Sequence, residues 1–460
     1  MTQRICLVVD NPLRDLDGLV LVAWELARRG VEAWLVPMYE QAFDVQTIKP
    51  DLVLLNYVRS NNLELVKAYQ RSGSRVGVLD TEGTGGKSAD EFAMLVANSG
   101  AAGWVDLYCT WGTDQLEALE RKGIVAAAQL RLTGCPRYDF CASRWLAALP
   151  VPAAKPGYVL VNTNFSVVNP RFSASTSDER NTMVKAGFSP EFADAYVRDA
   201  RVALQGVLAL LAQLLAAFPE RNFILRPHPF ESHEPYRRLE AHGNFQIRQE
   251  GTSVEWLNQA SALVHLNCST ALEAAMLGKP RLSPSWLDTP ALNVPGPHRL
   301  SRQARTPADL VDMLGEVLAG PPGRELAADA NGLRPSHYLI DGHAAARVAE
   351  AVVATLAEGR RDDRIPRSTW RGRSIALSRR LFGHRSWTAL QVAFRKASPT
   401  LRRLKSFSGE QVSEIAARLD ACAGLEPGST RVDPMDRTPL ARSRLASRRS
   451  VRVSARPLGS

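Results

Sequence analysis

Cysteine is scarce in this chain, and its spacing fits neither a metal site nor a disulfide framework. The six cysteines include no C-x-x-C pair, and several lie within strand-like runs. Such cysteines are typical of small buried residues in a reducing compartment, so we expect a cytoplasmic protein. The sequence also lacks a charged and then apolar N-terminal signal, and it has no run of 18 uncharged apolar residues. On these grounds we expect neither export nor a membrane-spanning segment.

Two glycine motifs of nucleotide-binding enzymes are missing as well. No G-x-G-x-x-G follows the first strand-like run, and Gly83-Thr-Gly-Gly86 lacks the G-x-x-x-x-G-K-[ST] spacing of a phosphate loop. Nucleotide hydrolysis and dinucleotide redox chemistry are therefore poor fits, and we expect no bound cofactor. Asp15-Leu-Asp17 has the letters of a metal-binding pair, but it lies at the start of a predicted helix. We therefore expect no metal.

Acidic residues are few near the C-terminus, and this makes the overall charge of +10 misleading. Residues 360–460 hold 23 Lys or Arg and 8 Asp or Glu, a net charge of +15, which leaves −5 for residues 1–359. A mildly acidic body gives no reason to expect nucleic-acid binding. The basic character belongs to the C-terminal extension alone.

What the sequence does contain is a regular alternation of strand-like and helical segments. This rhythm is typical of a parallel, doubly wound sheet. A chain of 460 residues is also too long for one hydrophobic core. A proline-rich connection at 149–156 separates two such alternations. We therefore predict an α/β protein with one Rossmann-like domain at 1–150 and a second at 151–359.

The second domain contains two segments in which an apolar strand ends in a polar tip. Phe223–Phe230 reads Phe-Ile-Leu-Arg-Pro-His-Pro-Phe, and Ala262–Lys279 places Asn-Cys-Ser-Thr between an apolar run and a helix. In an open α/β sheet, ligands bind outside the carboxyl ends of the strands. We therefore expect a ligand site at these tips. Asn162 and Asn164, at the end of an earlier strand, are candidate contacts to a sugar or an acceptor.

The residue types at these tips fit a phosphorylated group. Ser269 and Thr270 stand at a predicted helix N-terminus, where backbone N–H groups and the helix dipole favour an anion. Arg226 and His228 can add charge-assisted hydrogen bonds, and the two flanking prolines restrict the direction of the histidine. Glu273 follows Ser269 by one helical turn and can accept hydrogen bonds from ribose hydroxyls.

Each of these residues also has a plain structural interpretation. A Ser-Thr pair before a helix is often only an N-cap, a loop histidine is often structural, and a helical glutamate is often simply exposed. The hypothesis of a nucleotide site depends on finding all three features in this order after two apolar strands.

The pair of motifs, Arg-Pro-His-Pro and Ser-Thr-x-x-Glu-Ala-x-x-x-Gly-Lys-Pro, resembles the C-terminal half of GT-B glycosyltransferases of bacterial surface-polysaccharide pathways. It is similar in particular to enzymes that use CMP-activated acid sugars and to CDP-glycerol glycerophosphotransferases. Residues 1 to about 355 resemble the family of surface carbohydrate biosynthesis proteins. The segments that carry this match, in order, are Pro12–Asp17, Leu79–Gly83, Gly134–Asp139, Asn162–Phe165 and Asp341–His343.

This resemblance implies a GT-B architecture and a glycosyltransferase. The donor would be a nucleotide sugar, with a CMP-linked ulosonic acid as the first to test, and the acceptor a polysaccharide or a lipid-linked sugar. The leaving phosphate would be stabilised by His228 as a catalytic residue, with Arg226, Ser269 and Thr270. Two alternatives stay open. One is an enzyme that epimerises a UDP-sugar at C2, and the other is a scaffold protein of the same pathway without turnover.

Activation of the acceptor hydroxyl calls for a general base, and the first domain offers four carboxylates for this role, Asp15, Asp17, Asp80 and Glu82. Glu82 is the favoured candidate because it follows a strand-like run, although Asp80 and Glu82 are equally suited to capping the next helix or bonding the glycine-rich turn. Arg14, Asp15 and Asp17 are candidate sugar or acceptor contacts, with Arg14 facing an acidic sugar. The alternative for the two aspartates is simple helix capping.

The C-terminal extension divides into two parts. Residues 360–423 mix aromatic and aliphatic side chains with arginines, which is typical of a basic amphipathic segment on an anionic inner leaflet. The alternative is a loosely packed basic extension. Residues 424–460 are rich in Pro, Ser, Thr and Arg, and we predict that they are disordered. We therefore expect a cytoplasmic protein that attaches peripherally to the inner membrane.

Overall fold

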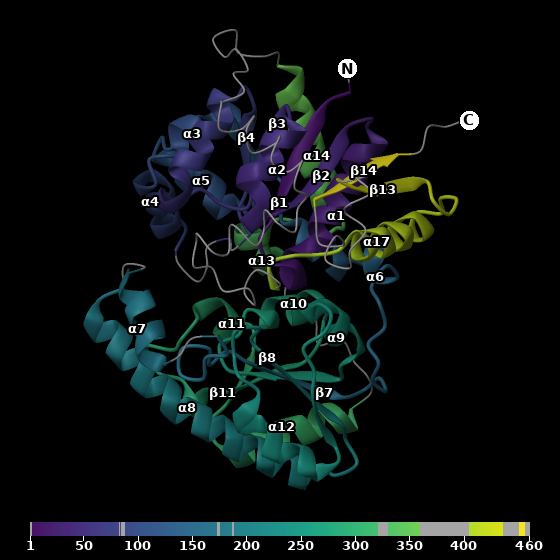
Figure 1. Ribbon diagram of the computed structural model, residues 1–460. Coiled ribbons are helices and arrows are strands. Elements are labelled where there is room, and N and C mark those ends of the chain that lie inside the picture. The colour runs from purple at the N-terminus through teal and green to yellow at the C-terminus, as the bar shows by residue number, and fades with distance from the viewer. Residues whose placement is uncertain are drawn as a thin grey trace. The chain divides into compact units, whose positions relative to one another are not determined.

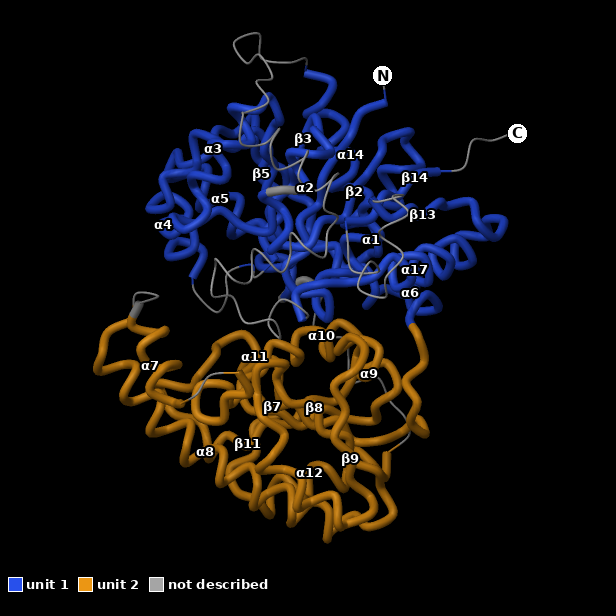
Figure 2. The backbone as a smooth tube through the Cα atoms, viewed as in Figure 1, with its two compact units in different colours: residues 1–149, 331–460 blue, residues 150–330 orange. Residues whose placement is uncertain are grey.

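The chain forms two compact units, and both of its ends belong to the first. The computed structural model describes residues 2–81, 83, 88–172, 175–185, 188–320, 330–358, 404–435 and 450–455. One unit consists of Met1–Leu149 and Asn331–Ser460, and the other of Pro150–Ala330 (Figure 2). Each unit is built on its own sheet with helices around it (Figure 1).

The described strands of the first unit form an eight-stranded sheet in the order β13-β14-β2-β1-β3-β4-β5-β6. Six of them are parallel, and most of their apolar residues are buried, as expected when helices cover both faces. These strands are β1 (Arg4–Val9), β2 (Glu32–Pro37), β3 (Leu52–Leu55), β4 (Arg75–Leu79), β5 (Leu107–Thr110) and β6 (Leu130–Leu132). The helices that follow them are α1 (Pro12–Arg28), α2 (Gln41–Ile48), α3 (Leu63–Arg71), α4 (Ala89–Asn98), α5 (Thr113–Arg121) and α6 (Ser143–Leu146).

Segments from the C-terminal part of the chain complete this unit. They are α14 (Ala344–Ala357), α17 (Gly409–Cys422), β13 (Thr430–Pro434) and β14 (Val451–Ala455), with α13 (Ala330–His337) at the junction. Both α14 and α17 pack against α1. β14 pairs antiparallel with β2, and β13 pairs antiparallel with β14. This hairpin covers the edge that β2 would otherwise expose.

The predicted second domain, residues 151–359, is wrong at its C-terminal end. Residues 331–358 belong to the first unit, because α14 docks there through its N-terminus. The backbone N–H groups of Ala344 and Ala345 donate to the buried carboxylate of Asp139 at 2.9 and 2.7 Å. Arg347 adds a hydrogen bond of 2.7 Å to the carbonyl of Thr133. These contacts satisfy helix-terminal donors that would otherwise lack partners.

The predicted disordered tail, residues 424–460, is also wrong where the structure describes it. Val451 and Val453 are completely buried, because β14 fills the space beside β2. The end of the predicted amphipathic segment, 404–423, contains α17, whose Asp420 carboxylate accepts a 2.8 Å hydrogen bond from Nε1 of Trp24. The remainder of that segment, 360–403, lies outside the described residues.

The second unit is a six-stranded sheet, all parallel among the strands described, in the order β12-β11-β10-β7-β8-β9. The strands are β7 (Val159–Thr163), β8 (Phe223–Pro227), β9 (Phe245–Ile247), β10 (Ala262–His265), β11 (Arg281–Pro284) and β12 (Arg302–Ala304). The helices are α7 (Thr176–Lys185), α8 (Pro190–Ala217), α9 (Ser253–Gln259), α10 (Thr270–Met276), α11 (Pro295–Arg299) and α12 (Pro307–Ala319).

The strand order of the second unit reverses direction at β7. β8, the next strand of the chain, pairs with one side of β7, and β10 pairs with the other. Asn162 therefore stands in register with Arg226 on β8 and with His265 on β10. Such a switch point opens a crevice at the carboxyl ends of the two central strands, which is where doubly wound sheets bind ligands.

Among the residues that the structure describes, one helix, α8, is long and apolar enough to cross a membrane by length and composition alone, which was not predicted from the sequence. Half of its most apolar window is buried inside the protein. Its inward-facing residues join the core that also contains the side chains of β7, β8 and β10. These contacts are those of a core helix packed on the sheet.

Candidate functional site

Hydrogen bonds join the loops after β7 and β8 at the carboxyl edge of the second sheet. The backbone N–H of Arg171 donates to the carbonyl of Phe230 at 2.8 Å. Asn169 and Ser232 exchange two hydrogen bonds, of 2.9 and 2.7 Å, between the same loops. The loop that carries His228 is therefore braced by its neighbour and held in a narrow range of positions.

A buried glutamate, Glu231, ties these loops to the end of β7. Its side chain accepts hydrogen bonds from the Thr163 hydroxyl at 3.0 Å, the Phe165 N–H at 3.0 Å and the Tyr236 hydroxyl at 2.5 Å. Burial raises the pKa of this carboxyl. Glu231 was not predicted from the sequence, because a single glutamate after a proline-rich loop has no distinctive spacing. Its only signal was the tyrosine five residues later.

His228 is half-buried and oriented from two sides. Its backbone N–H donates to the carbonyl of Thr163 at 3.0 Å, and its Nδ1 accepts a hydrogen bond of 3.3 Å from the N–H of Phe230. Because Nδ1 is an acceptor, the neutral ring carries its proton on Nε2. The loop therefore presents a hydrogen-bond donor, which is the form that an oxyanion requires.

Arg226, predicted to bind a phosphate, has a different task in the structure. The side chain is 9% exposed, and its guanidinium donates to the carbonyls of Glu250 and Gly251 at 2.5 and 2.8 Å. It also lies over the ring of Trp256, 5.4 Å from the centroid. Burial lowers its pKa to about 10. These contacts assign Arg226 to holding the loop after β9, and the predicted phosphate role is not supported.

The turn from β10 into α10 is held in an uncommon conformation. Asn267 has a φ of +51°, in the left-handed region that asparagine tolerates better than most residues. Its Nδ2 donates to Oδ1 of Asp288 at 2.6 Å. The next N–H, of Cys268, donates to Nδ1 of His265 at 3.3 Å, and Nε2 of His265 contacts the Ser301 hydroxyl at 2.8 Å. Both sides of the turn are therefore fixed by side chains.

Ser269 and Thr270 follow this turn directly. Ser269 is exposed and makes no capping hydrogen bond within the described part of the chain, so the N-cap interpretation does not explain it. The Thr270 hydroxyl accepts a 2.9 Å hydrogen bond from Nδ2 of Asn162. The two hydroxyls thus differ: Thr270 fastens α10 to β7, and Ser269 faces outward.

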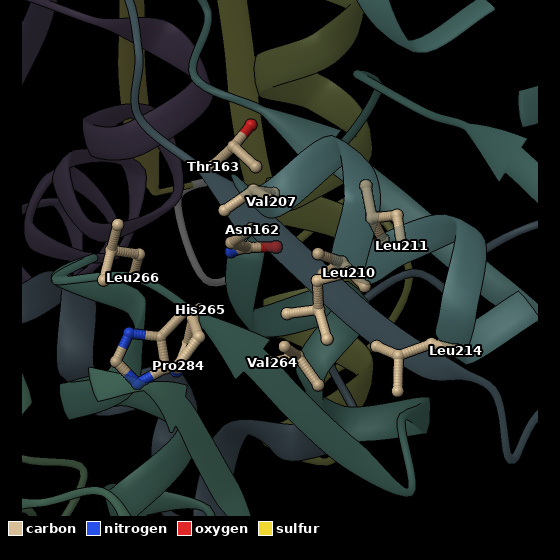
Figure 3. A pocket seen from close by; sticks show the side chains of 11 residues that line it. Asn162, Thr163, Val207, Leu210, Leu211, Leu214, Val264, His265, Leu266 and Pro284 are labelled. Carbon is tan, nitrogen blue, oxygen red and sulfur yellow. The ribbon is translucent and has the colours of Figure 1, made fainter. Parts of the chain in front are cut away.

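Asn162, near the carboxyl end of β7, is buried, at 5% exposure. It lines a small cavity between the sheet and the leucines of α8, together with Thr163 and His265 (Figure 3). The cavity, about 10 Å³, has room for about one water molecule. Oδ1 of Asn162 has no hydrogen-bond partner among the residues described. Asn162 is therefore a support for Thr270 and not the predicted direct sugar contact, whereas Asn164 is exposed and stays a candidate.

Glu273 is buried, at 5% exposure, and accepts a short hydrogen bond from the Ser253 hydroxyl on α9. The interpretation as an exposed helical residue is therefore wrong. Its role as a ribose contact stays a prediction, because a carboxylate has two oxygens and can accept several donors.

In the first unit, the predicted charged residues pair with one another. The Arg14 guanidinium lies 2.8 Å from Asp15, 3.1 Å from Asp10 and 3.1 Å from the Thr81 hydroxyl. Lys405, from the C-terminal extension, places Nζ 2.5 Å from the other oxygen of Asp10. The positive charge of Arg14 is thus compensated within the protein, and its contact with an acidic sugar stays a prediction.

The carboxylates of this unit have mainly structural contacts. Asp15 is 6% exposed and accepts the N–H of the residue that caps α1 at 3.1 Å, which supports the capping interpretation. Asp17 is half-buried within α1. Asp80 is 2% exposed and lies 3.1 Å from the guanidinium of Arg59. Glu82, the predicted general base, lies outside the described residues, and its role stays a prediction.

Comparisons with known proteins report on the fold. No family model matches the sequence, and no curated protein matches it. A putative UDP-N-acetylglucosamine 2-epimerase from Listeria monocytogenes aligns with a TM-score of 0.50 and 13% identity over 79% of this chain and 100% of that one. The UDP-GlcNAc 2-epimerase from Neisseria meningitidis gives 0.48 and 11% over 77% and 100%, and the wall teichoic acid polymerase TagF gives 0.45 and 11% over 77% and 89%. At such identities the likeness concerns the fold alone, and it confirms the predicted class, an α/β protein with two Rossmann-like domains of the GT-B type.

Proposed function

We propose that this protein is a glycosyltransferase that moves a sugar from a nucleotide donor to a surface-polysaccharide or lipid-linked acceptor. The observation that carries the proposal is the braced His228, whose Nε2 proton is offered at the carboxyl edge of the second sheet, beside its switch point. The outward-facing hydroxyl of Ser269 stands at the same edge.

The position of His228 suits the chemistry of glycosyl transfer. When the bond between the anomeric carbon and the phosphate oxygen breaks, negative charge develops on the leaving phosphate. A donor fixed before the reaction stabilises that charge without the cost of reorganisation. His228 is fixed in this way by Thr163 and Phe230. The choice of a CMP-linked ulosonic acid as the first donor to test comes from the sequence resemblance of the two motifs.

Substitution His228→Ala should lower kcat by about 10²-fold, because removal of one preorganised donor to an oxyanion costs that much. The exposed His242→Ala is the matched control and should retain normal turnover. In the same assay, Glu273→Gln should raise the donor KM more than it lowers kcat if Glu273 holds the ribose. Near-normal turnover of the His228 variant with an intact fold would remove it from the reaction.

A thermal-shift series with CMP, CDP, UDP, GDP and dTDP tests the proposal as a whole. All five are added at the same concentration. A nucleotide whose Kd is about 100 times lower than that concentration stabilises the folded state by about 2.7 kcal/mol, so the base that binds most tightly gives the largest rise in Tm. If none of the five raises Tm, the protein is not a nucleotide-dependent enzyme of this kind. The scaffold alternative would then be favoured.

The second candidate is epimerisation of a UDP-sugar, and the fold similarity to a 2-epimerase is the observation that favours it. The two activities differ in what they need, because an epimerase acts on the nucleotide sugar without any acceptor. Incubation with UDP-GlcNAc alone, followed by NMR of the sugar ring protons, separates them. Accumulation of an epimer without acceptor would replace the glycosyltransferase proposal.

Peripheral attachment to the inner membrane is a further part of the proposal. It is supported by the composition of 360–403, which holds 13 Lys or Arg and 2 Asp or Glu. Each basic residue near an anionic surface contributes about 1 kcal/mol. Replacement of Arg379, Arg380, Arg402 and Arg403 by Gln should therefore reduce co-sedimentation with phosphatidylglycerol vesicles at low salt. Equal sedimentation of variant and wild type would argue against this attachment.

A further inference from the structure

A second histidine of the second unit, His298, stands beside a carboxylate that is itself fixed in place. Nδ1 of His298, on α11, lies 3.3 Å from Oδ2 of Asp288. Oδ1 of Asp288 accepts the 2.6 Å hydrogen bond from Asn267, and Oδ2 accepts a 2.5 Å hydrogen bond from Nδ2 of Asn293. The carboxylate is 10% exposed, whereas the imidazole is 38% exposed. The pair therefore has a mostly buried, oriented carboxylate and a ring that reaches solvent.

This pair lies at the edge of the sheet where the nucleotide site is proposed. Asn267, which bonds Asp288, precedes the outward-facing Ser269 by two residues. The helix α11, which carries His298, packs against α10, and both stand at the same end of the second unit (Figure 1). A single side-chain contact thus links the turn before α10 to the Asp288 carboxylate.

The neighbours of the two histidine rings favour opposite tautomers. Nδ1 of His228 accepts an N–H, which leaves the proton on Nε2. Nδ1 of His298 is shielded from solvent, makes no aligned hydrogen bond to any residue that the structure describes, and has the Asp288 carboxylate as its ion-pair neighbour. A carboxylate neighbour places the proton on Nδ1 and leaves the Nε2 lone pair to accept another. Such contacts are often poorly aligned without substrate and tighten when it binds.

We infer that His298, positioned by Asp288, is the general base for the acceptor hydroxyl in place of Glu82, an inference that rests on the proposed glycosyltransferase function. Nε2 of His298 takes the hydroxyl proton as the acceptor oxygen forms its bond to the anomeric carbon. The bond from that carbon to the phosphate oxygen breaks, and the phosphate keeps the electron pair and receives a hydrogen bond from His228. The imidazolium is stabilised by Asp288 and later releases its proton to solvent.

The kinetic test compares His298→Gln, Asp288→Asn and the control Arg299→Gln, whose side chain is exposed on the same helix. With the donor identified by the nucleotide series and its acceptor, His298→Gln should lower kcat by about 10²-fold or more with the nucleotide-induced rise in Tm unchanged. Asp288→Asn should lower kcat, because it removes the charge beside Nδ1 of His298. The donor KM should change little, because the amide oxygen of the new side chain can still accept the hydrogen bond from Asn267 that holds the turn before Ser269. The control should match wild type.

The outcomes separate the two proposals. If nucleotide binds and transfer occurs, but His298→Gln turns over within threefold of wild type, the assignment of His298 is overturned and the glycosyltransferase proposal stands. If no nucleotide binds or no transfer occurs, both fall. Nitrogen-15 NMR of the histidine rings gives a readout independent of activity, with resonances assigned through the His228 and His298 variants. Neutral His298 should be protonated on Nδ1 and His228 on Nε2; protonation of His298 on Nε2 would also overturn the inference.

Discussion

Deletion of residues 404–460 is expected to unfold the first unit, although the sequence predicted an amphipathic segment at 360–423 and a disordered tail at 424–460. Val451 and Val453 of β14 and Val412 and Leu419 of α17 are all completely buried. Full burial of one such side chain contributes about 1.5–3 kcal/mol. Four of them approach the whole stability of an ordinary domain, about 5–15 kcal/mol. Circular dichroism and limited proteolysis of the truncated chain should therefore show loss of the N-terminal sheet.

A point substitution tests the same contact without removing any chain. The Asp420 carboxylate accepts hydrogen bonds from Nε1 of Trp24 at 2.8 Å, the Thr430 N–H at 2.9 Å and the Thr430 hydroxyl at 2.7 Å. Asp420→Ala should lower the free energy of unfolding by about 1–3 kcal/mol, because it leaves donors without partners. The exposed Glu414→Ala, on the same helix, is the control. A truncated protein whose first unit still melts cooperatively would contradict the expected unfolding. An Asp420→Ala variant as stable as the wild type would contradict the expected role of this carboxylate.

The central strands could be predicted from the sequence because they are mainly apolar runs, as in β1, β3, β7 and β10, and such runs do not depend on distant partners. β14 could not, since Val451-Arg-Val-Ser-Ala455 has only two buried side chains within a run of arginines and serines. What makes it a strand is the open edge of β2, more than 400 residues earlier in the chain. The composition of a terminal segment therefore describes its average residue type. It does not reveal the two valines whose burial makes β14 a strand.

The candidate site was likewise predictable from the sequence only in part. The strand-tip rule correctly brought His228 and Ser269 to one edge, because parallel strands end on the same side of a sheet. It could not reveal that Arg226 turns toward carbonyls 24 and 25 residues later. Nor could it pair Asp288 with His298, since their approach depends on the path between η7 (Ser285–Leu287) and α11. Direction of a side chain is decided by packing, which spacing does not encode.

Acid is expected to destabilise the second unit steeply between pH 6.5 and pH 3, because of one buried histidine beneath the site. His265 is 2% exposed, and burial, with a smaller effect of Arg281, lowers its pKa to about 3. In the unfolded chain the same ring takes a proton near pH 6.5. The stabilisation from keeping it neutral is therefore complete above pH 6.5 and is lost as the pH falls toward 3. The slope is about 1.4 kcal/mol per pH unit.

The substitution His265→Gln should flatten this dependence. A glutamine can accept from the Cys268 N–H and donate to the Ser301 hydroxyl, as His265 does, but it does not titrate. Hydrogen exchange of peptides that cover β7 and β10, measured from pH 7 to pH 4, restricts the readout to this unit. That restriction matters because burial also lowers the pKa of His337, in the first unit, to about 4. If the wild-type and variant stabilities fall in parallel, with His242→Gln as the exposed control, His265 does not govern the acid response, and the turn that carries Ser269 is held by other contacts.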